Sequence, residues 1–295
     1  MKARLLLGTP EPHWLWDPDP RFNDVVFFVS RTRLARRTTS HPRALHDFCL
    51  DSGGFTELQR HGRWTLTAEE YVAEVRRYRD ELGPERMLWA APQDLMCEEV
   101  VIRGGVFHGQ RFHGTRELRG LKPGDPEQDL TTAVRIHQRL TVQNAVELRR
   151  LAPDIPFILV LQGNNFEDYK YCARLYAEAG FDLASEPLIG LGSVCRRENT
   201  EEIAEIVDYF HEQGLRMHGF GVKTGGLGIY GDQLVSADSQ AWSYGYRKRK
   251  IRLPQCTHGA KTCANCKEGA LAWYRRVKDT PPDFRQLMFH VGAAA

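Results

Sequence analysis

The sequence predicts an α/β protein, a (β/α)8 TIM-like barrel with a zinc-binding subdomain at its C-terminal end. Eight short apolar segments are spaced along the chain, helix-like stretches separate several of them, and three cysteines crowd between Cys256 and Cys266. Strands that alternate with helices form parallel sheets, and eight such strands favour a closed barrel over an open sheet. We expect the barrel to span residues 1–245, and the zinc-binding loop with the C-terminal helices to span 246–295.

The apolar segments have the length and composition of buried strands of a parallel sheet. In chain order they are Leu5–Thr9, Val25–Ser30, Phe48–Gly53, Met87–Asp94, Phe157–Gly163, Leu188–Val194, Arg216–Val222 and Leu234–Asp238.

Helix signals lie between these segments. Thr67 begins a capping-box pattern ahead of a stretch with helical periodicity. Asn199 can cap a helix that ends at Gly214, and Glu167–Gly180 combines helical spacing with a terminal glycine. The Gly-rich and charged segment Val101–Asp129 predicts a long loop over the mouth of the barrel.

Composition narrows the function classes. The chain has 295 residues, 42% of them hydrophobic, with a net charge of +2, so any nucleic-acid surface must be local. The apolar run near the N-terminus is too short for a signal peptide, and no run approaches the roughly 20 residues that span a bilayer. Seven cysteines, mostly isolated in apolar segments, favour a metal site in a reducing cytoplasm over a disulfide framework.

Polar residues occur where the predicted strands should end. In a barrel all these ends open on one face, where active sites are built. Gly53 and Gly54 would let the backbone approach a flat ligand closely. Buried strands end where polar residues begin. Any one of these residues taken alone could therefore equally well be polar for this structural reason as for a functional one. The residues are Asp51, Asp94, Gln162, Ser193, Lys223 and Asp238.

Three cysteines indicate a metal site. Cys256, Cys263 and Cys266 have a spacing that suits tetrahedral zinc, which requires a fourth ligand. His290 can fold back as a pair of helices closes, whereas His258 would have to bind within a tight chelate ring. We therefore favour His290, with His258 as the alternative; reduced thiols without metal are the competing interpretation. Four protein ligands would make the zinc structural.

The segment after the last predicted strand is aromatic and then basic. Aromatic faces could stack on bases and the cations could contact phosphates. The alternative is a solvated basic loop with core aromatics, but the position between a strand-end aspartate and the zinc loop favours nucleic-acid binding. The residues are Trp242, Tyr244, Tyr246, Arg247, Lys248, Arg249, Lys250 and Arg252.

Several motifs together resemble the tRNA-guanine transglycosylase superfamily. DSGGF, PQD, LQG, GLGSV, HGFGVKT, SADS and the cysteine-rich loop occur in the superfamily's order, and they cover most of the chain between Phe48 and His290. The zinc loop is longer than the C-x-C-x2-C typical of the tRNA enzymes, and QAWSYGYRKR replaces their LPTR-like segment. No extra C-terminal RNA-binding domain is seen, and the sequence is most similar to the DpdA-type branch, which modifies DNA.

This resemblance implies exchange of guanine for a 7-deazaguanine base such as preQ0. By motif match, Asp238 would be the nucleophile on C1′, and Asp51 the general acid and base. A carboxylate suits attack at an oxocarbenium-like centre, with a covalent glycosyl-enzyme holding the sugar while the bases exchange.

The resemblance also implies a slot for the base. Phe55 would stack on it, and Asp94 would accept hydrogen bonds from the N1–H and the exocyclic amine, which adenine does not present. Gln162 and the backbone of Leu191 and Gly192 would bond the O6 and C7 side. His218 and Phe220 would wall the other face, and Ser52, Gly53 and Gly163 complete the implied substrate-binding set.

DNA is the expected partner, with tRNA as the alternative substrate. Base flipping would bring the target guanine to the barrel mouth. The near-neutral charge favours a helper protein that grips the DNA, and the resemblance also allows a homodimer, for which the sequence fixes no interface. A non-catalytic nucleic-acid-binding subunit is a further alternative, but such subunits tend to lose the acids that this chain retains. A barrel hydrolase with catalytic zinc would need metal ligands at strand ends, which the sequence does not show.

Overall fold

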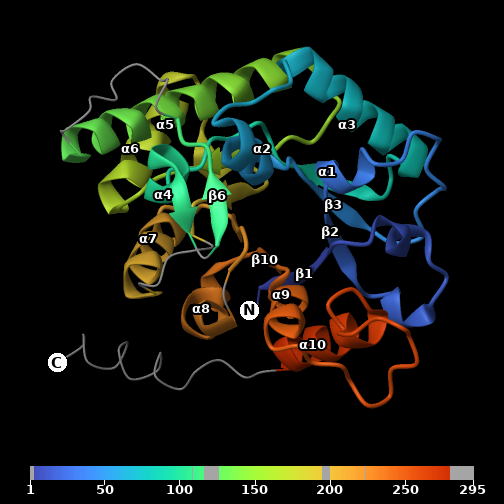
Figure 1. Cartoon of the computed structure of the whole chain (residues 1–295). Helices are drawn as coiled ribbons and strands as arrows, with labels where there is room; N and C mark the ends of the chain where they lie inside the picture. Colours follow the sequence, from blue (N-terminus) through green and yellow to red (C-terminus); the bar gives the residue numbers. More distant parts are fainter. Residues whose placement is uncertain (1–2, 108, 116–125, 195–199, 223, 280–295) are drawn as a thin grey trace.

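The fold is described from a computed structural model, which covers residues 3–107, 109–115, 126–194, 200–222 and 224–279. Eight parallel strands form one curled sheet in the order β4-β3-β2-β1-β10-β9-β8-β7 (Figure 1). Each coincides with one of the apolar segments, so the prediction of eight strands is confirmed. The strands are β1 (Arg4–Thr9), β2 (Val26–Ser30), β3 (Phe48–Asp51), β4 (Met87–Ala90), β7 (Leu159–Leu161), β8 (Ile189–Leu191), β9 (Met217–Gly219) and β10 (Ser236–Ser239).

The two edges of this sheet meet. An isolated parallel bridge pairs Ala90, at the end of β4, with Phe157, just before β7. The Ala90 N–H donates to Pro156 O (3.1 Å), and the Ile158 N–H donates to Ala90 O (3.1 Å). The strands therefore form the TIM-like arrangement that the alternation of strands and helices predicts.

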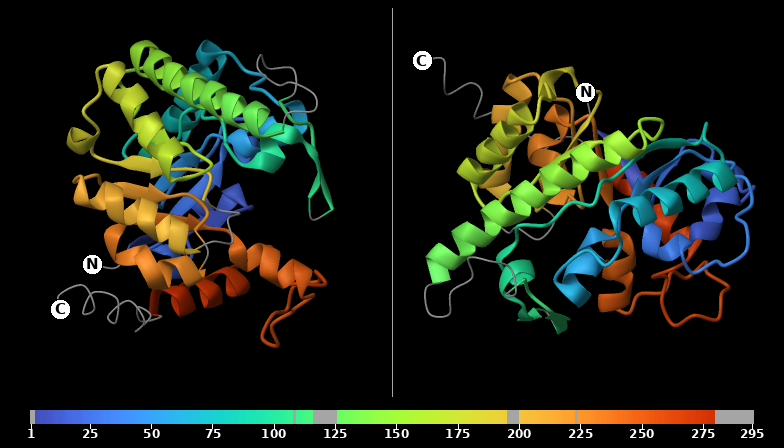
Figure 2. Two further views of the ribbon diagram at one scale, coloured as in Figure 1. Left: turned by 90° about the vertical axis from the view of Figure 1, so that its left-hand side faces the viewer. Right: turned by 90° about the horizontal axis from the view of Figure 1, so that it is seen from above.

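Helices surround the strands (Figures 1 and 2). The α-helices are α1 (Arg31–Leu34), α2 (Gly54–His61), α3 (Ala68–Leu82), α4 (Glu99–Arg103), α5 (Pro126–Leu151), α6 (Phe166–Glu178), α7 (Thr200–Glu212), α8 (Thr224–Tyr230), α9 (Ala241–Lys248) and α10 (Lys267–Asp279). Short 3-10 turns are η1 (Pro12–Trp16), η2 (Pro20–Phe22), η3 (Leu183–Ser185) and η4 (Gly231–Gln233). In the described part of the chain, no helix is both long enough and apolar enough to cross a membrane.

Local signals account for several helix ends. The capping box predicted at Thr67 is present, because its hydroxyl accepts from the Glu70 N–H while the Glu70 carboxylate accepts from the Thr67 N–H. Asn165 and Asp168 make the same reciprocal pair at the start of α6. The cap predicted at Asn199 lies outside the described residues.

Strand residues alternate between the inside of the barrel and the helix layer, as the pleat requires. Outward residues such as Leu7, Phe27 and Leu50 pack against helices. Asp51 lies two residues after the inward-facing Cys49, and Gln162 lies two residues after the inward-facing Val160. Both polar side chains therefore also face inward, at the carboxyl mouth of the barrel. The apolar inward set is Leu6, Val26, Cys49, Trp89, Ala91, Ile158, Val160 and Leu188.

The C-terminal helix completes the outer layer. Helix α10 packs against α9 and β1. Its Trp273 and Tyr274 belong to the same buried cluster as Leu5, Trp14 and Phe27, so the region after the cysteine loop shares a core with the barrel.

The segment expected to be one long loop contains regular structure. Helix α4 is followed by an antiparallel hairpin of β5 (Gly105–Phe107) and β6 (Gln110–Phe112), which projects from the barrel (Figure 2). Gly104, with φ of 73°, ends α4, and a Cβ there would lie 2.7 Å from His113 O. The prediction of one long loop was therefore wrong for Val101–Phe112, because glycine-permitted turns allow a compact hairpin, and for its last residues, which begin α5 at Pro126. Residues 116–125 lie outside the described part.

Candidate active site and metal centre

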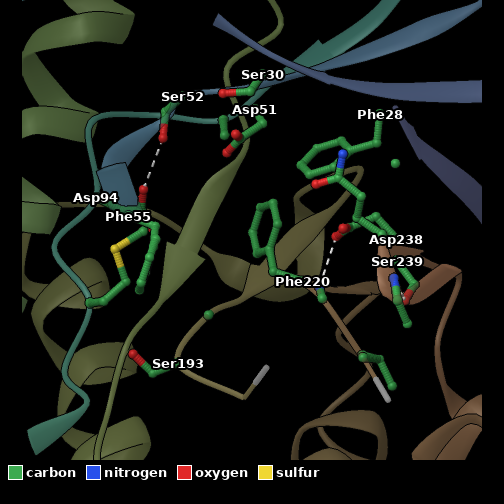
Figure 3. Close-up of a pocket in the computed structure, with 18 of the residues that line it drawn as sticks. Phe28, Ser30, Asp51, Ser52, Phe55, Asp94, Ser193, Phe220, Asp238 and Ser239 are labelled. Atoms are coloured by element: carbon green, nitrogen blue, oxygen red, sulfur yellow. Dashed lines mark hydrogen bonds between the residues drawn. The ribbon is translucent and has the colours of Figure 1, made fainter. Parts of the chain in front are cut away.

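A cavity of about 650 Å³ opens at the carboxyl ends of the strands. The carboxylates of Asp51 and Asp238 both face it (Figure 3). The structure thus brings together residues from β3, β10 and the segments after β4, β7 and β8, which are far apart in sequence. Of the predicted site residues, those that line the cavity are Asp51, Ser52, Phe55, Asp94, Gln162, Gly192, Phe220 and Asp238.

Asp238 is held from two sides. Its Oδ1 accepts a hydrogen bond from the Gly221 N–H (2.9 Å) and lies 3.3 Å from His218 Nε2. The other ring nitrogen of His218 lies 2.8 Å from Ser236 Oγ. His218 is fully buried beneath the cavity, so it orients the carboxylate of Asp238 and does not wall the base slot.

Asp51 ends strand β3 beside the first turn of α2. Burial raises the pKa of Asp51, and the charge of Asp238 raises it further, while hydrogen bonds from the Ser30 hydroxyl and the Gly53 N–H act in the opposite direction. The electrostatic coupling between Asp51 and Asp238 agrees with their shared cavity. A carboxyl group with a raised pKa can carry a proton near neutral pH, which a general acid requires.

Asp94 anchors a chain of hydrogen bonds across the cavity wall. Its Oδ2 accepts from Gln162 Nε2 (2.6 Å), and its Oδ1 accepts from the Ser52 hydroxyl (3.4 Å). Burial raises the pKa of Asp94 to about 7, and the charge of Asp51 adds to this effect, whereas the bond from Gln162 opposes it.

Ser193 extends this chain to the other side of the cavity. Its hydroxyl contacts Gln162 Oε1 (2.5 Å) and accepts from the Cys97 N–H (2.8 Å). Ser193 has φ of 56°, a left-handed conformation that non-glycine residues rarely adopt and that is found mainly at functional sites. A Cβ on Gly192 would lie 2.4 Å from Gln162 Nε2, so glycine is needed there for the amide to occupy its place.

Three predicted binding residues support the wall without lining it. Gly53 has φ of 76°, and a Cβ there would lie 2.7 Å from Thr32 Cγ2, so it serves the turn into α2. At Gly163 a Cβ would meet Tyr169 and Asp168 at the start of α6. Leu191 points into the outer core, and its carbonyl accepts from the Phe220 N–H.

Several lining residues were not predicted from the sequence. Phe28 and Ser30 continue the inward positions of β2, so strand alternation could have identified them. Arg33 comes from helix α1 and Phe107 from the hairpin. No sequence signal places these last two beside the acids, because their position depends on how the loops fold over the mouth.

A buried arginine behind the site was also missed. Arg31 is 6% exposed and pairs with Glu57 (2.6 Å) and Glu74 (2.9 Å). Its Nε donates to Ser52 O (3.1 Å). Arg31 therefore ties the turn after Asp51 to helices α2 and α3.

The cysteine loop has the geometry of a tetrahedral metal site. The Sγ atoms of Cys256, Cys263 and Cys266 and a nitrogen of His258 all lie within 4.8 Å of one another. The Cys263 Sγ lies 3.5 Å from Cys256 Sγ and 3.5 Å from His258 Nε2. These spacings match the roughly 3.8 Å edge of a tetrahedron with zinc–sulfur bonds of about 2.3 Å.

The histidine in this cluster is the alternative that the sequence analysis ranked second. His258 supplies the fourth donor, while the favoured His290 lies outside the described residues. Arg252 donates hydrogen bonds to both Cys256 O and His258 O, and these bonds curl the loop. The curled loop lets His258 reach the same centre as Cys256 although the two residues are close in sequence. Backbone N–H groups of Leu253 and Gly269 donate to the thiols of Cys263 and Cys266, respectively, and such bonds favour thiolates. The donor set fits structural zinc.

The aromatic and basic segment divides into core and surface. Trp242 is 2% exposed, stacks on Trp14 (5.8 Å between centroids) and donates to Gly8 O, so its predicted contact with nucleic acid was wrong. Tyr246 is half-buried against the same core. Tyr244 is 56% exposed and lines the cavity, which makes it the aromatic face available to a ligand. The basic residues are exposed, namely Arg247, Lys248, Arg249, Lys250 and Arg252.

A family model matches the chain over residues 1–115 and 126–294, with the description "DpdA: DeoxyPurine in DNA protein A". The chain belongs to the DpdA family. The family's description names deoxypurines in DNA. Membership agrees with the DpdA-type resemblance of the sequence motifs.

Other comparisons add little. No curated protein matches the chain. Among solved structures, a putative isomerase from Sinorhizobium meliloti in an open-loop conformation is similar with 11% identity and a TM-score of 0.35. The match covers 80% of this chain and 50% of that one. A similarity of this size carries no argument about function.

Proposed function

We propose that this protein replaces guanine in DNA with a 7-deazaguanine base such as preQ0, through a covalent glycosyl-aspartate intermediate. The observation that carries the proposal is that Asp51 and Asp238 open onto one cavity at the carboxyl mouth of the barrel. Family membership supports DNA as the polymer.

The chemistry divides between the two acids. Asp238 attacks C1′ of the target nucleotide, forming a C1′–O bond as the C1′–N9 bond to guanine breaks, and Asp51 gives a proton to the departing base. The incoming base then loses a proton to Asp51 while its nitrogen displaces Asp238 from C1′. The raised pKa of Asp51 favours the protonated form that the first step requires.

The cavity walls suit a purine-like ring. Phe55 and Phe220 provide apolar faces, and Asp94 offers acceptor oxygens. Gln162 uses one amide N–H on Asp94, which leaves the second for a base oxygen. A site whose buried polar groups need partners rejects bases that leave them unpaired.

The test is exchange of labelled base. Purified protein is incubated with labelled guanine or preQ0 and with either guanine-containing DNA or tRNA, and label in the polymer is counted. We expect label in DNA and a protein–DNA adduct that survives denaturation. Asp238→Asn should abolish both, while Glu147→Gln, an exposed carboxylate on α5, should leave them unchanged. Full exchange by Asp238→Asn would refute the assignment of Asp238 as the nucleophile. Label found in tRNA but not in DNA would refute DNA as the substrate.

A further inference from the structure

Two arginines near the mouth of the cavity have no acid in direct contact within the described part of the chain. The segment Arg31–Arg37 has the sequence RTRLARR, and Arg31 and Arg37 are engaged locally, Arg37 through Ser40 O and the Trp16 ring. In the described part of the chain, the guanidinium groups of Arg33 and Arg36 make no hydrogen bond or ion pair. These two side chains are therefore available to a ligand.

Arg33 stands at the cavity itself. It lines the cavity together with Asp238, Gln240, Ala241 and Tyr244. It is half-buried, so part of its hydration is already lost. A half-buried cation without a direct ion pair gains stability when a ligand supplies an anion.

Arg247, from helix α9, joins Arg33 and Arg36 in one cluster. Burial lowers the pKa of Arg33 and the positive charges of Arg36 and Arg247 lower it further, while the negative charge of Glu11 acts in the opposite direction, so these three charged residues lie within electrostatic reach of Arg33. Arg247 is exposed and lies one helical turn after Tyr244. Strands β2 and β10 flank β1 in the sheet, so α1 and α9 approach the mouth from either side of β1.

We infer that Arg33, Arg36 and Arg247 bind the DNA phosphates that flank the target nucleotide when its base enters the cavity. This inference rests on the proposed function. A phosphodiester beside the sugar would sit near Asp238, which must reach C1′, and the same wall presents Arg33. Guanidinium groups suit phosphate oxygens, and Tyr244, which lines the same cavity as Arg33, offers a face to an adjacent base.

The test measures DNA binding and its salt dependence. Fluorescence anisotropy with a labelled guanine-containing strand gives the Kd of the wild type, Arg33→Gln and Arg33→Lys at several salt concentrations. Loss of one phosphate contact reduces the slope of log K against log salt by about 0.7 to 0.9. We expect Arg33→Gln to bind severalfold more weakly with such a reduction, and Arg33→Lys to retain most of the slope.

Arg43→Gln is the matched control. Arg43 is exposed and bonds Glu85 and Asp80 O at the end of α3, which leads into β4 and so lies at the opposite end of the barrel. The Arg43→Gln variant loses the same positive charge as Arg33→Gln, and it should leave both the Kd and the slope of log K against log salt unchanged. Thermal unfolding should show that Arg33→Gln remains folded, since the Arg33 guanidinium makes no hydrogen bond or ion pair within the described residues.

The outcomes separate the two proposals. If Arg33→Gln keeps the wild-type slope and Kd while the wild type exchanges base in DNA, the phosphate site is refuted and the proposed function stands. If Arg43→Gln lowers the slope as much as Arg33→Gln does, the effect is one of general charge and the inference also fails. If the wild type exchanges no base but Arg33→Gln alone lowers the slope, the phosphate site stands and the exchange chemistry is refuted.

Discussion

The Asp94 carboxyl group shows how one residue couples recognition to pH. Its pKa of about 7 lies well above the usual value because burial disfavours the charge. To accept two hydrogen bonds from guanine it must be ionised, and this occurs only above that pKa. The same ionisation is costly to the fold, since the unfolded chain ionises near pH 4 at no such cost.

We predict that the affinity for guanine increases as pH rises from 6 to 8. Below pH 7 Asp94 is protonated and presents a donor where the base also presents a donor. Calorimetric titration of free guanine at several pH values measures this. Asp80→Asn, which changes an exposed carboxylate, should preserve the pH profile; a pH-independent affinity in the wild type would contradict the prediction.

Asp94→Asn should stabilise the protein while impairing the site. Because the native state holds its proton up to pH 7 and the unfolded state loses it near pH 4, the carboxyl group destabilises the native state progressively across that range. We expect the asparagine variant to have a higher Tm than the wild type at pH 8 and a similar Tm at pH 4. A lower Tm at pH 8 would show that the Gln162 and Ser52 bonds outweigh the burial cost.

At the scale of an element, helix α9 has two faces with different tasks. Trp242 packs inward on Trp14 and bonds Gly8 O, whereas Tyr244, two residues later, points to the cavity mouth. Residues two apart lie on different sides of a helix, so one short helix can anchor in the core and still present a ring to a ligand.

Substitution of the two aromatics should separate stability from binding. Trp242→Ala removes a buried side chain and should lower the free energy of unfolding by about 3–5 kcal/mol. Tyr244→Ala should change it by less than about 0.5 kcal/mol but weaken DNA binding by about 1–3 kcal/mol, the range of a base-stacking contact. Denaturant unfolding and anisotropy measure the two effects, and the reverse pattern would contradict the assignment of the faces.

At the scale of the whole molecule, the cysteine loop ties the chain's last described helix to its first strand. Cys266 immediately precedes α10, whose Tyr274 hydroxyl donates to Leu5 O in β1. A metal that fixes the loop therefore also fixes α10 against the barrel. Zinc bound by four ligands at this place would stabilise the fold and take no part in the reaction.

Removal of the metal should lower the Tm. We expect one zinc per chain in the purified protein, a marked fall in Tm with a strong chelator, and loss of zinc in His258→Ala. His290→Ala is the matched control and should keep its zinc. Zinc retained by His258→Ala but lost from His290→Ala would restore His290 as the ligand.

The sequence by itself determined the eight strands and the positions of the acids at their ends. Those features are local, because apolar runs, period-two alternation and cap residues act within a few neighbours. Asp51 and Asp238 could be assigned because their DSGGF and SADS motifs resemble those of the superfamily, and each lies at or near the end of a short strand. The donors Cys256, Cys263 and Cys266 were equally visible from their spacing.

Only the tertiary structure decided which side chains surround the acids. Trp242 and Tyr244 are both aromatic residues of one short segment, and the sequence does not show which of them is buried. The orientation of α9 against Trp14 decides that Trp242 is buried and that Tyr244 faces the cavity. Arg33 reaches the cavity because β2 and β10 lie on either side of β1, a pairing between residues far apart in the chain. Spacing argued against His258, yet the curl of its loop brings it to the cysteines. Burial and long-range packing set these outcomes, and neither is encoded in any short window of the chain.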